Sequence, residues 1–315
     1  MQKNDGISFL RGIAAFGIVG CHLLLMSRTE AGWAVTSLCD MNMGLFAAVS
    51  GYLMALGGWK GWTAYAKKRA SRILPVYVVW TIVYLVVSVA FQLVDGGAGK
   101  ACYSDLRRWY YVIFWGAAAT HLWFFVSLFY AQIAMAWIFR KVAGCWWIVA
   151  SLIVISLSIW YKNWYVTYPI RLLAFLMLGR GLAALDRDWL QRHRIEIALV
   201  AGLGVVIHFV HLPCLVGFVK DWIAVGPILL MFVACSDWFV TGRLAVVASF
   251  FGATSMGVYL LHPIFTKGVG IVVRWIFAAP YGVVPVMADW GVSWLCALAV
   301  TLLLLRFSKL ARFVR

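Results

Sequence analysis

An apolar run near the N-terminus, Ile7–Leu25, is long enough for one helix to cross a membrane. Its nineteen residues are interrupted by one charged side chain, Arg11, and by one histidine, His22. Such groups are costly inside a membrane, so they are candidates for function. They stand eleven positions apart, roughly three turns, which places both on nearly the same helix face about 16 Å apart. Alternatively, Arg11 extends to the membrane surface and His22 bonds a backbone carbonyl.

The composition extends this reading to the whole chain. Apolar residues make up 64% of the 315 positions and charged residues 12%, against about 25% charged in soluble domains. Long apolar runs favour helices over a barrel of alternating strands. We therefore predict an all-α polytopic membrane protein, with one transmembrane domain over 1–315 and about ten helices in one bundle. The expected spans are 7–27, 41–58, 73–94, 122–139, 145–161, 168–185, 195–211, 222–240, 247–266 and 287–305.

Two further apolar segments, 103–120 and 268–285, are interrupted by polar residues. They are predicted to lie at the membrane interface or to re-enter the membrane. With the N-terminus inside, 17 of the 27 Lys and Arg residues fall in inner segments and 8 in outer ones, with Arg11 and Arg171 inside spans. The positive-inside rule favours this orientation, which leaves both termini in the cytoplasm.

The net charge of +16 is accounted for by this inner rim of cations, so no nucleic-acid partner is expected. The seven cysteines include no C-x-x-C pair and no Cys/His group with zinc spacing, so no metal site is expected.

The predicted orientation gathers titratable side chains in the outer half of the membrane. His22 lies in the outer half of the first span, and further candidates for contact with a substrate lie near outer helix ends: His121, Arg171, Tyr259 and His262. Trp123 and Tyr259 are also candidates for stacking on sugar faces. Interfacial histidines are common in membrane proteins, and this accounts equally well for some of these positions.

The inner side carries a different motif. Residues 67–72 read KKRASR, and Arg69 and Arg72 share a helix face because they are three positions apart. Such a pair can hold a phosphorylated ligand through forked hydrogen bonds. Alternatively, the segment is a cationic anchor that contacts anionic membrane lipid.

Five segments in order along the chain resemble motifs of the family-3 membrane acyltransferases. They are LRGIAAFGIVGCH at 10–22, FAAVSGYL at 46–53, RASR at 69–72, HLWFF at 121–125 and YLLHP at 259–263. Two positions depart from the family pattern: Ser8 stands where many members have an aspartate, and Ala47 replaces a common second phenylalanine.

The resemblance implies transfer of an acyl group, most often acetyl, from cytoplasmic acyl-CoA to a hydroxyl of an extracytoplasmic glycan or lipid-linked saccharide. It implies a multi-pass protein of a bacterial inner membrane. On this reading His22 is the general base or a transient acyl carrier, and Arg11, Arg69 and Arg72 serve the acetyl-CoA end. Alternatively, Arg11 orients the thioester on its path towards His22. Two non-catalytic alternatives remain open. One is a small-molecule binding or transport domain, as in the membrane part of serine racemase-type resistance proteins, and the other is a polysaccharide-assembly partner.

Overall fold

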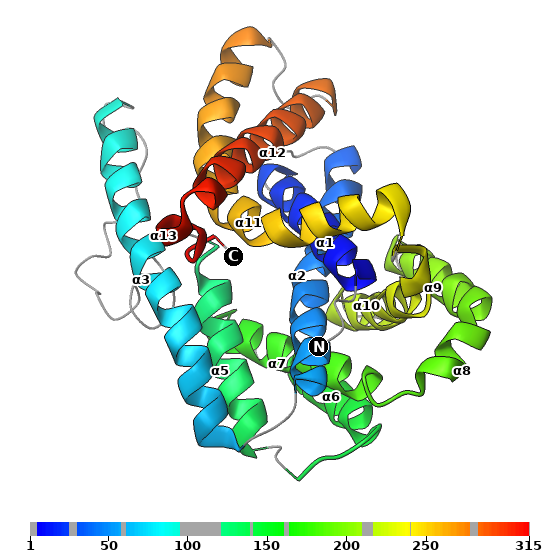
Figure 1. Ribbon diagram of the computed structural model, residues 1–315. Helices are drawn as coiled ribbons and strands as arrows, with labels where there is room; N and C mark the ends of the chain where they lie inside the picture. Colours follow the sequence, from blue (N-terminus) through cyan, green and yellow to red (C-terminus); the bar gives the residue numbers. More distant parts are fainter. Residues whose placement is uncertain are drawn as a thin grey trace.

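The computed structural model describes residues 5–24, 30–57, 61–94, 121–138, 141–160, 164–209, 217–239, 241–277 and 283–314. Within these ranges the chain forms helices and connecting turns, without a strand (Figure 1). The helices are α1 (Asp5–Leu24), α2 (Glu30–Leu56), α3 (Trp62–Val94), α5 (Trp123–Ile138), α6 (Trp146–Leu157), α7 (Trp164–Leu182), α8 (Arg187–Arg192), α9 (Arg194–Phe209), α10 (Gly217–Ala234), the 3-10 turn η2 (Ser236–Phe239), α11 (Gly242–Ile276), α12 (Val283–Arg306) and α13 (Ser308–Ala311).

The all-α membrane class is confirmed. Four described helices are long and apolar enough to cross a membrane: Gly6–Leu23, Trp62–Ala90, Gly242–Val273 and Val284–Arg306. Shorter apolar helices cover Met41–Leu56, Trp123–Ile138 and Trp146–Leu157. The count of ten spans and the cytoplasmic position of the termini remain predictions.

Three helices extend beyond the predicted bounds. α2 and α3 each begin eleven residues before the expected spans at 41 and 73. In α3 the added turns are rich in Ala, Lys and Arg, which are strong helix formers. The segment 268–285, predicted to lie at the interface or to re-enter the membrane, begins inside α11, which continues to Ile276; its position relative to the membrane remains a prediction. A helix satisfies its own backbone groups, which favours its continuation in an apolar environment. The segment 103–120 lies outside the described residues.

α1 lies in the middle of the bundle, where it packs against α2, α10, α11 and α12 (Figure 1). Its side chains Ile18 and Val19 are almost fully buried. Elsewhere in the core, α2 and α7 approach each other closely at two glycines. A Cβ at Gly51 would overlap the carbonyl oxygen of Leu176, and one at Gly179 would overlap that of Ala48. The absence of side chains at these positions therefore permits backbone contact.

α3 lies at the edge of the molecule beside α5 (Figure 1). Only 17% of the apolar stretch of α3 is buried inside the protein, against 56% of that of α1. Its buried side is a stripe of Tyr77, Trp80 and Tyr84. Trp80 donates its indole N–H to the carbonyl of Phe313 at 2.9 Å, and Tyr84 donates its hydroxyl to the carbonyl of Leu260 at 2.5 Å. These polar contacts attach α3 to the C-terminal segment and to α11.

Candidate active site

α1 carries both residues that the sequence singled out in the first span. The helix is continuous from Asp5 to Leu24, so the predicted spacing of Arg11 and His22 along one face is confirmed. Both side chains are partly exposed. A fixed cation therefore lies near one end of this helix and an imidazole near the other, about 16 Å apart.

Three histidines from separate parts of the chain meet at the His22 end of α1. The ring centroids of His22 and His262, from α11, are 4.8 Å apart. His121, which precedes α5, lies with its ring centroid 5.5 Å from that of His262. His121 and His262 are 1% and 0% exposed, whereas His22 is partly accessible. The partly accessible imidazole of His22 thus packs against the buried ring of His262, which in turn contacts the buried ring of His121.

Two tyrosines hold this histidine cluster (His22, His121 and His262) together. Tyr259 donates its hydroxyl to the backbone carbonyl of His121 at 2.6 Å. Tyr84 of α3 packs its ring edge-on to His121, at a centroid distance of 4.7 Å. A bond from α11 to the His121 backbone and a contact from α3 therefore fix the segment that enters α5.

The hydrogen bond of His262 defines which of its nitrogens carries a proton. Nδ1 of His262 lies 2.7 Å from the backbone carbonyl of Tyr259. A carbonyl only accepts, so Nδ1 is the donor, and the neutral ring keeps its lone pair on Nε2. Among the described residues, neither Nε2 of His262 nor the ring nitrogens of His121 have a hydrogen-bond partner. Buried polar atoms are normally satisfied, so these nitrogens are candidates for contact with a ligand or for proton transfer.

Tyr259 does not fit its predicted role as a sugar-stacking surface. Its side chain is only 2% exposed, and its ring packs among the aromatic rings of Phe46, Phe124 and Phe125. The residue therefore positions His121 and His262 from within the core. The position of an aromatic residue near an outer helix end does not indicate whether its side chain is buried or exposed.

Arg69 lies in a second polar cluster, towards the opposite end of α3. Its Nε donates to the hydroxyl of Tyr65 at 2.9 Å, one helical turn away. Arg180 of α7 interacts electrostatically with the same phenol and stacks over Trp147, with Cζ 4.9 Å from the ring centroid. Arg69 therefore bonds Tyr65 directly, and Arg180 lies within electrostatic range of the same phenol. Arg72 is exposed, so the two arginines of the motif differ in environment.

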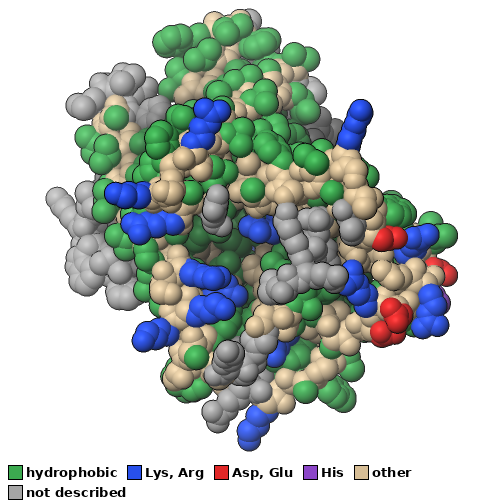
Figure 2. All heavy atoms as spheres, in the orientation of Figure 1, with side chains coloured by type: hydrophobic (Ala, Val, Ile, Leu, Met, Phe, Trp, Pro, Cys, Tyr) green, Lys and Arg blue, Asp and Glu red, His purple; other side chains and the backbone are tan. Residues whose placement is uncertain are grey.

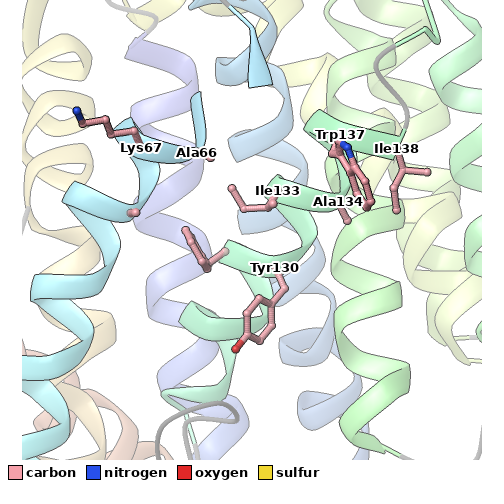
Figure 3. Close-up of a pocket in the computed structure, with 9 residues that line it drawn as sticks. Ala66, Lys67, Tyr130, Ile133, Ala134, Trp137 and Ile138 are labelled. Carbon is pink, nitrogen blue, oxygen red and sulfur yellow. The ribbon is translucent and has the colours of Figure 1, made fainter. Parts of the chain in front are cut away.

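The other flank of this part of α3 faces α5 across an apolar groove of about 610 Å³. Figure 3 shows Lys67 at one end of the groove, with Ala66 beside it and Tyr130, Ile133 and Trp137 projecting from α5. Arg69 contacts Tyr65 instead. The structure thus separates Lys67, on an apolar surface, from Arg69, in a polar cluster. Figure 2 shows that Lys and Arg side chains gather on the face drawn there, with the few acidic ones at its edge.

Arg171 lies outside the histidine cluster formed by His22, His121 and His262. Its guanidinium lies over the ring of Tyr168 at 5.1 Å, and Tyr168 packs against Trp123 at 4.6 Å. Asp221 interacts with Arg171 electrostatically, and its Oδ1 lies 3.1 Å from Nδ1 of His208.

The His208–Asp221 pair was not predicted, because the sequence places no acidic residue in the middle of a span and so does not support an aspartate-oriented histidine; Asp40 and Asp289, at outer span ends, were only the nearest candidates. In the structure, Asp289 accepts a hydrogen bond from Ser293 at 2.8 Å, and the Asp40 side chain lies outside the described residues. One signal was present in the sequence. His208 ends one predicted span and Asp221 precedes the next, so an antiparallel pair of helices brings them together.

A family model described as an acyltransferase domain, family 3, matches residues 4–306 of the chain. No curated protein and no solved structure matched it.

Proposed function

The chain belongs to acyltransferase family 3, and on that premise we propose that it transfers an acetyl group from cytoplasmic acetyl-CoA to a hydroxyl of an extracytoplasmic glycan or lipid-linked saccharide. The membrane would be the inner membrane of a bacterium. The observation that carries the proposal is the contact of His22 with His262 at one end of a helix that carries Arg11 at the other.

Two helices are arranged in the same way, with an arginine towards the N-terminal end and a contact with the histidine cluster towards the C-terminal end. α1 runs from Arg11 to His22, and α3 runs from Arg69 to Tyr84, which contacts His121. At 1.5 Å per residue, these separations are about 16 and 22 Å. Each helix therefore carries an arginine at one depth and a member or neighbour of the histidine cluster at another. This arrangement suits a substrate with phosphates at one end and a reactive thioester at the other.

The donor end of the proposed site is cationic. The guanidiniums of Arg69 and Arg180 flank Tyr65, and Arg72 follows one turn after Arg69. Arginine forks match phosphate oxygens in a planar, bidentate geometry. Tyr65 orients Arg69 through its Nε and leaves the terminal nitrogens for the phosphates. Arg11 of α1 is proposed to align the thioester on its path to His22.

The chemical step is proposed to use His22 as general base. Its imidazole takes the proton of the acceptor hydroxyl as that oxygen bonds to the acyl carbon. The carbon–sulfur bond then breaks, and the proton passes to the leaving sulfur to give the free CoA thiol. Neutral imidazole suits both transfers because its free ring nitrogen accepts a proton and can then return it.

His262 and His121 are proposed to act through His22. The lone pair on Nε2 of His262 can accept a hydrogen bond from the neighbouring ring and fix its tautomer. The bond from Tyr259 to the His121 backbone maintains this packing. Both residues are therefore positioning residues for the proposed base.

Mass spectrometry of envelope glycans from cells with and without the gene tests the proposal. A mass increment of one acetyl group per modified sugar, present only with the gene, is expected. Complementation with His22→Ala should not restore the increment, and complementation with the exposed His193→Ala should. Identical glycan spectra with and without the gene would favour the non-catalytic alternatives.

A further inference from the structure

We propose that Trp123, Tyr168, Arg171 and Asp221 form the acceptor subsite, which binds a neutral, hydroxyl-rich sugar ring. The inference rests on the proposed function, and it names the place and the chemical class of the acceptor. Trp123 lies on α5, Tyr168 and Arg171 lie on α7, and Asp221 lies on α10. The family description assigns no role to any of the four residues.

The aromatic part of this acceptor subsite is built by α5 and α7. The rings of Trp123 and Tyr168 have centroids 4.6 Å apart and are tilted by 45°. Tyr168 is 36% exposed, and Trp123 is partly exposed. Large aromatic faces that remain accessible offer apolar contact area, and their polar edges remain available for hydrogen bonds. The C–H face of a sugar ring is apolar in the same way, so the two surfaces match.

The polar part lies directly beside the rings. The Arg171 guanidinium stacks on Tyr168 at 5.1 Å and interacts with the Asp221 carboxylate. Oδ1 of Asp221 lies 3.1 Å from Nδ1 of His208, and the two side chains are 15% and 5% exposed. The carboxylate therefore lies against a buried imidazole while part of it stays accessible.

This pairing of groups suits hydroxyls better than a charged ligand. An arginine only donates hydrogen bonds and a carboxylate only accepts them, whereas a sugar hydroxyl does both. Adjacent hydroxyls on one ring can therefore be satisfied by Arg171 and Asp221 together. Because Asp221 already offsets the charge of Arg171, the acceptor subsite has little net attraction for an anion.

The position of the acceptor subsite relative to the histidines follows from the chain. Trp123 stands two residues after His121, whose ring contacts that of His262 at 5.5 Å. His262 in turn contacts His22 at 4.8 Å. The acceptor subsite therefore begins two residues along the chain from the cluster that contains the proposed base.

The test uses the full-length protein in lipid nanodiscs on an array of immobilised neutral and acidic saccharides. In parallel, hydrolysis of acetyl-CoA is measured without an acceptor. Tyr168→Ala and Arg171→Lys should each weaken binding to neutral saccharides by about tenfold or more, since aromatic and arginine anchors dominate such contacts. Tyr130→Ala is the matched control, because Tyr130 is 37% exposed on α5 and lies in the apolar groove. It should bind like the wild type.

Three outcomes overturn the inference: no saccharide binding by the wild type, binding to acidic saccharides alone, or equal binding by Tyr168→Ala and Tyr130→Ala. Acetyl-CoA turnover separates this failure from failure of the proposed function. Loss of saccharide binding in both subsite variants with His22-dependent hydrolysis retained supports both ideas. The same binding pattern without any hydrolysis by the wild type supports the subsite and contradicts acyl transfer.

Discussion

His22 and His262, from opposite ends of the sequence, have ring centroids 4.8 Å apart, and the inner ring is fixed by a 2.7 Å bond to the Tyr259 carbonyl. The partly accessible His22, which we propose as the base, thus packs against a buried imidazole whose tautomer is set by the backbone of its own helix. If His262 orients His22, as we propose, its loss should differ from the loss of His22.

His262→Ala is expected to lower kcat for transfer while leaving the KM for acetyl-CoA nearly unchanged. The substitution removes the group that orients the base, and general-base catalysis contributes about 10²–10⁴ in rate. Steady-state kinetics on purified protein measures both constants. Tyr259→Phe, which removes only the hydroxyl bonded to His121, should have a smaller effect in the same direction. A parallel rise of donor KM with an unchanged kcat would place His262 in donor binding instead.

Replacing Arg69 and Arg72 by lysine is expected to weaken acetyl-CoA binding while membrane insertion stays normal. Lysine keeps the charge but lacks the planar fork, and lipid attraction depends mainly on charge, at about 1 kcal/mol per residue. Of the single variants, Arg69→Lys should weaken binding more, because Arg69 is the one oriented by Tyr65. Isothermal calorimetry in detergent measures the affinity.

Lys67→Gln with Lys68→Gln is the comparison for that experiment. Lys67 lines the apolar groove next to α5, so its charge is expected to serve contact with lipid. The double variant should insert less well and bind acetyl-CoA normally. Unchanged affinity in the double arginine variant would mean that the motif is a charged rim and that the phosphates bind elsewhere.

Gly51→Ala is expected to destabilise the protein strongly, because its Cβ would overlap the backbone of Leu176 where α2 meets α7. Backbone atoms cannot move aside as a side chain can, so overpacking here costs about 1–3 kcal/mol or more. Gly202→Ala on α9 has open space around the new Cβ and should be neutral or slightly stabilising. Thermal unfolding followed by size-exclusion chromatography compares the two, and equal melting temperatures would contradict the close approach.

Cysteine labelling tests the orientation. A cysteine introduced at 62–66 should react with impermeant reagents only after the inner face is opened, and one at 98–104 should react in intact cells. The physical reason is the excess of Lys and Arg in the segments assigned to the inside. The reverse pattern would invert the assignment of donor and acceptor sides.

The sequence predicted the class of fold, the course of α1 and the spacing of Arg11 and His22, because each depends on local hydrophobicity and helix period. The HLWFF and YLLHP motifs also indicated His121 and His262. The sequence did not predict that these residues share one cluster, since contacts between helices depend on packing that local patterns do not encode. From the sequence, Arg69 and Arg72 were equally good candidates for phosphate binding. In the structure they differ, because Arg69 bonds to Tyr65 and Arg72 is exposed.

Helix ends were less predictable for the same reason. The sequence placed the start of α3 at residue 73, where polarity rises, but the Ala, Lys and Arg residues before it are strong helix formers and extend the helix to Trp62. The burial of Tyr259 depends on Phe46, Phe124 and Phe125, which come from two other helices. No spacing within YLLHP reveals that environment.

The central claim is that His22 takes the proton in acyl transfer from acetyl-CoA. Purified wild-type protein in nanodiscs, given radiolabelled acetyl-CoA and envelope glycan extract, should transfer label to the glycan. His22→Ala should lose this transfer by at least about 10²-fold while eluting and melting like the wild type, and His193→Ala should retain it. Near-normal transfer by a folded His22→Ala protein would contradict the account.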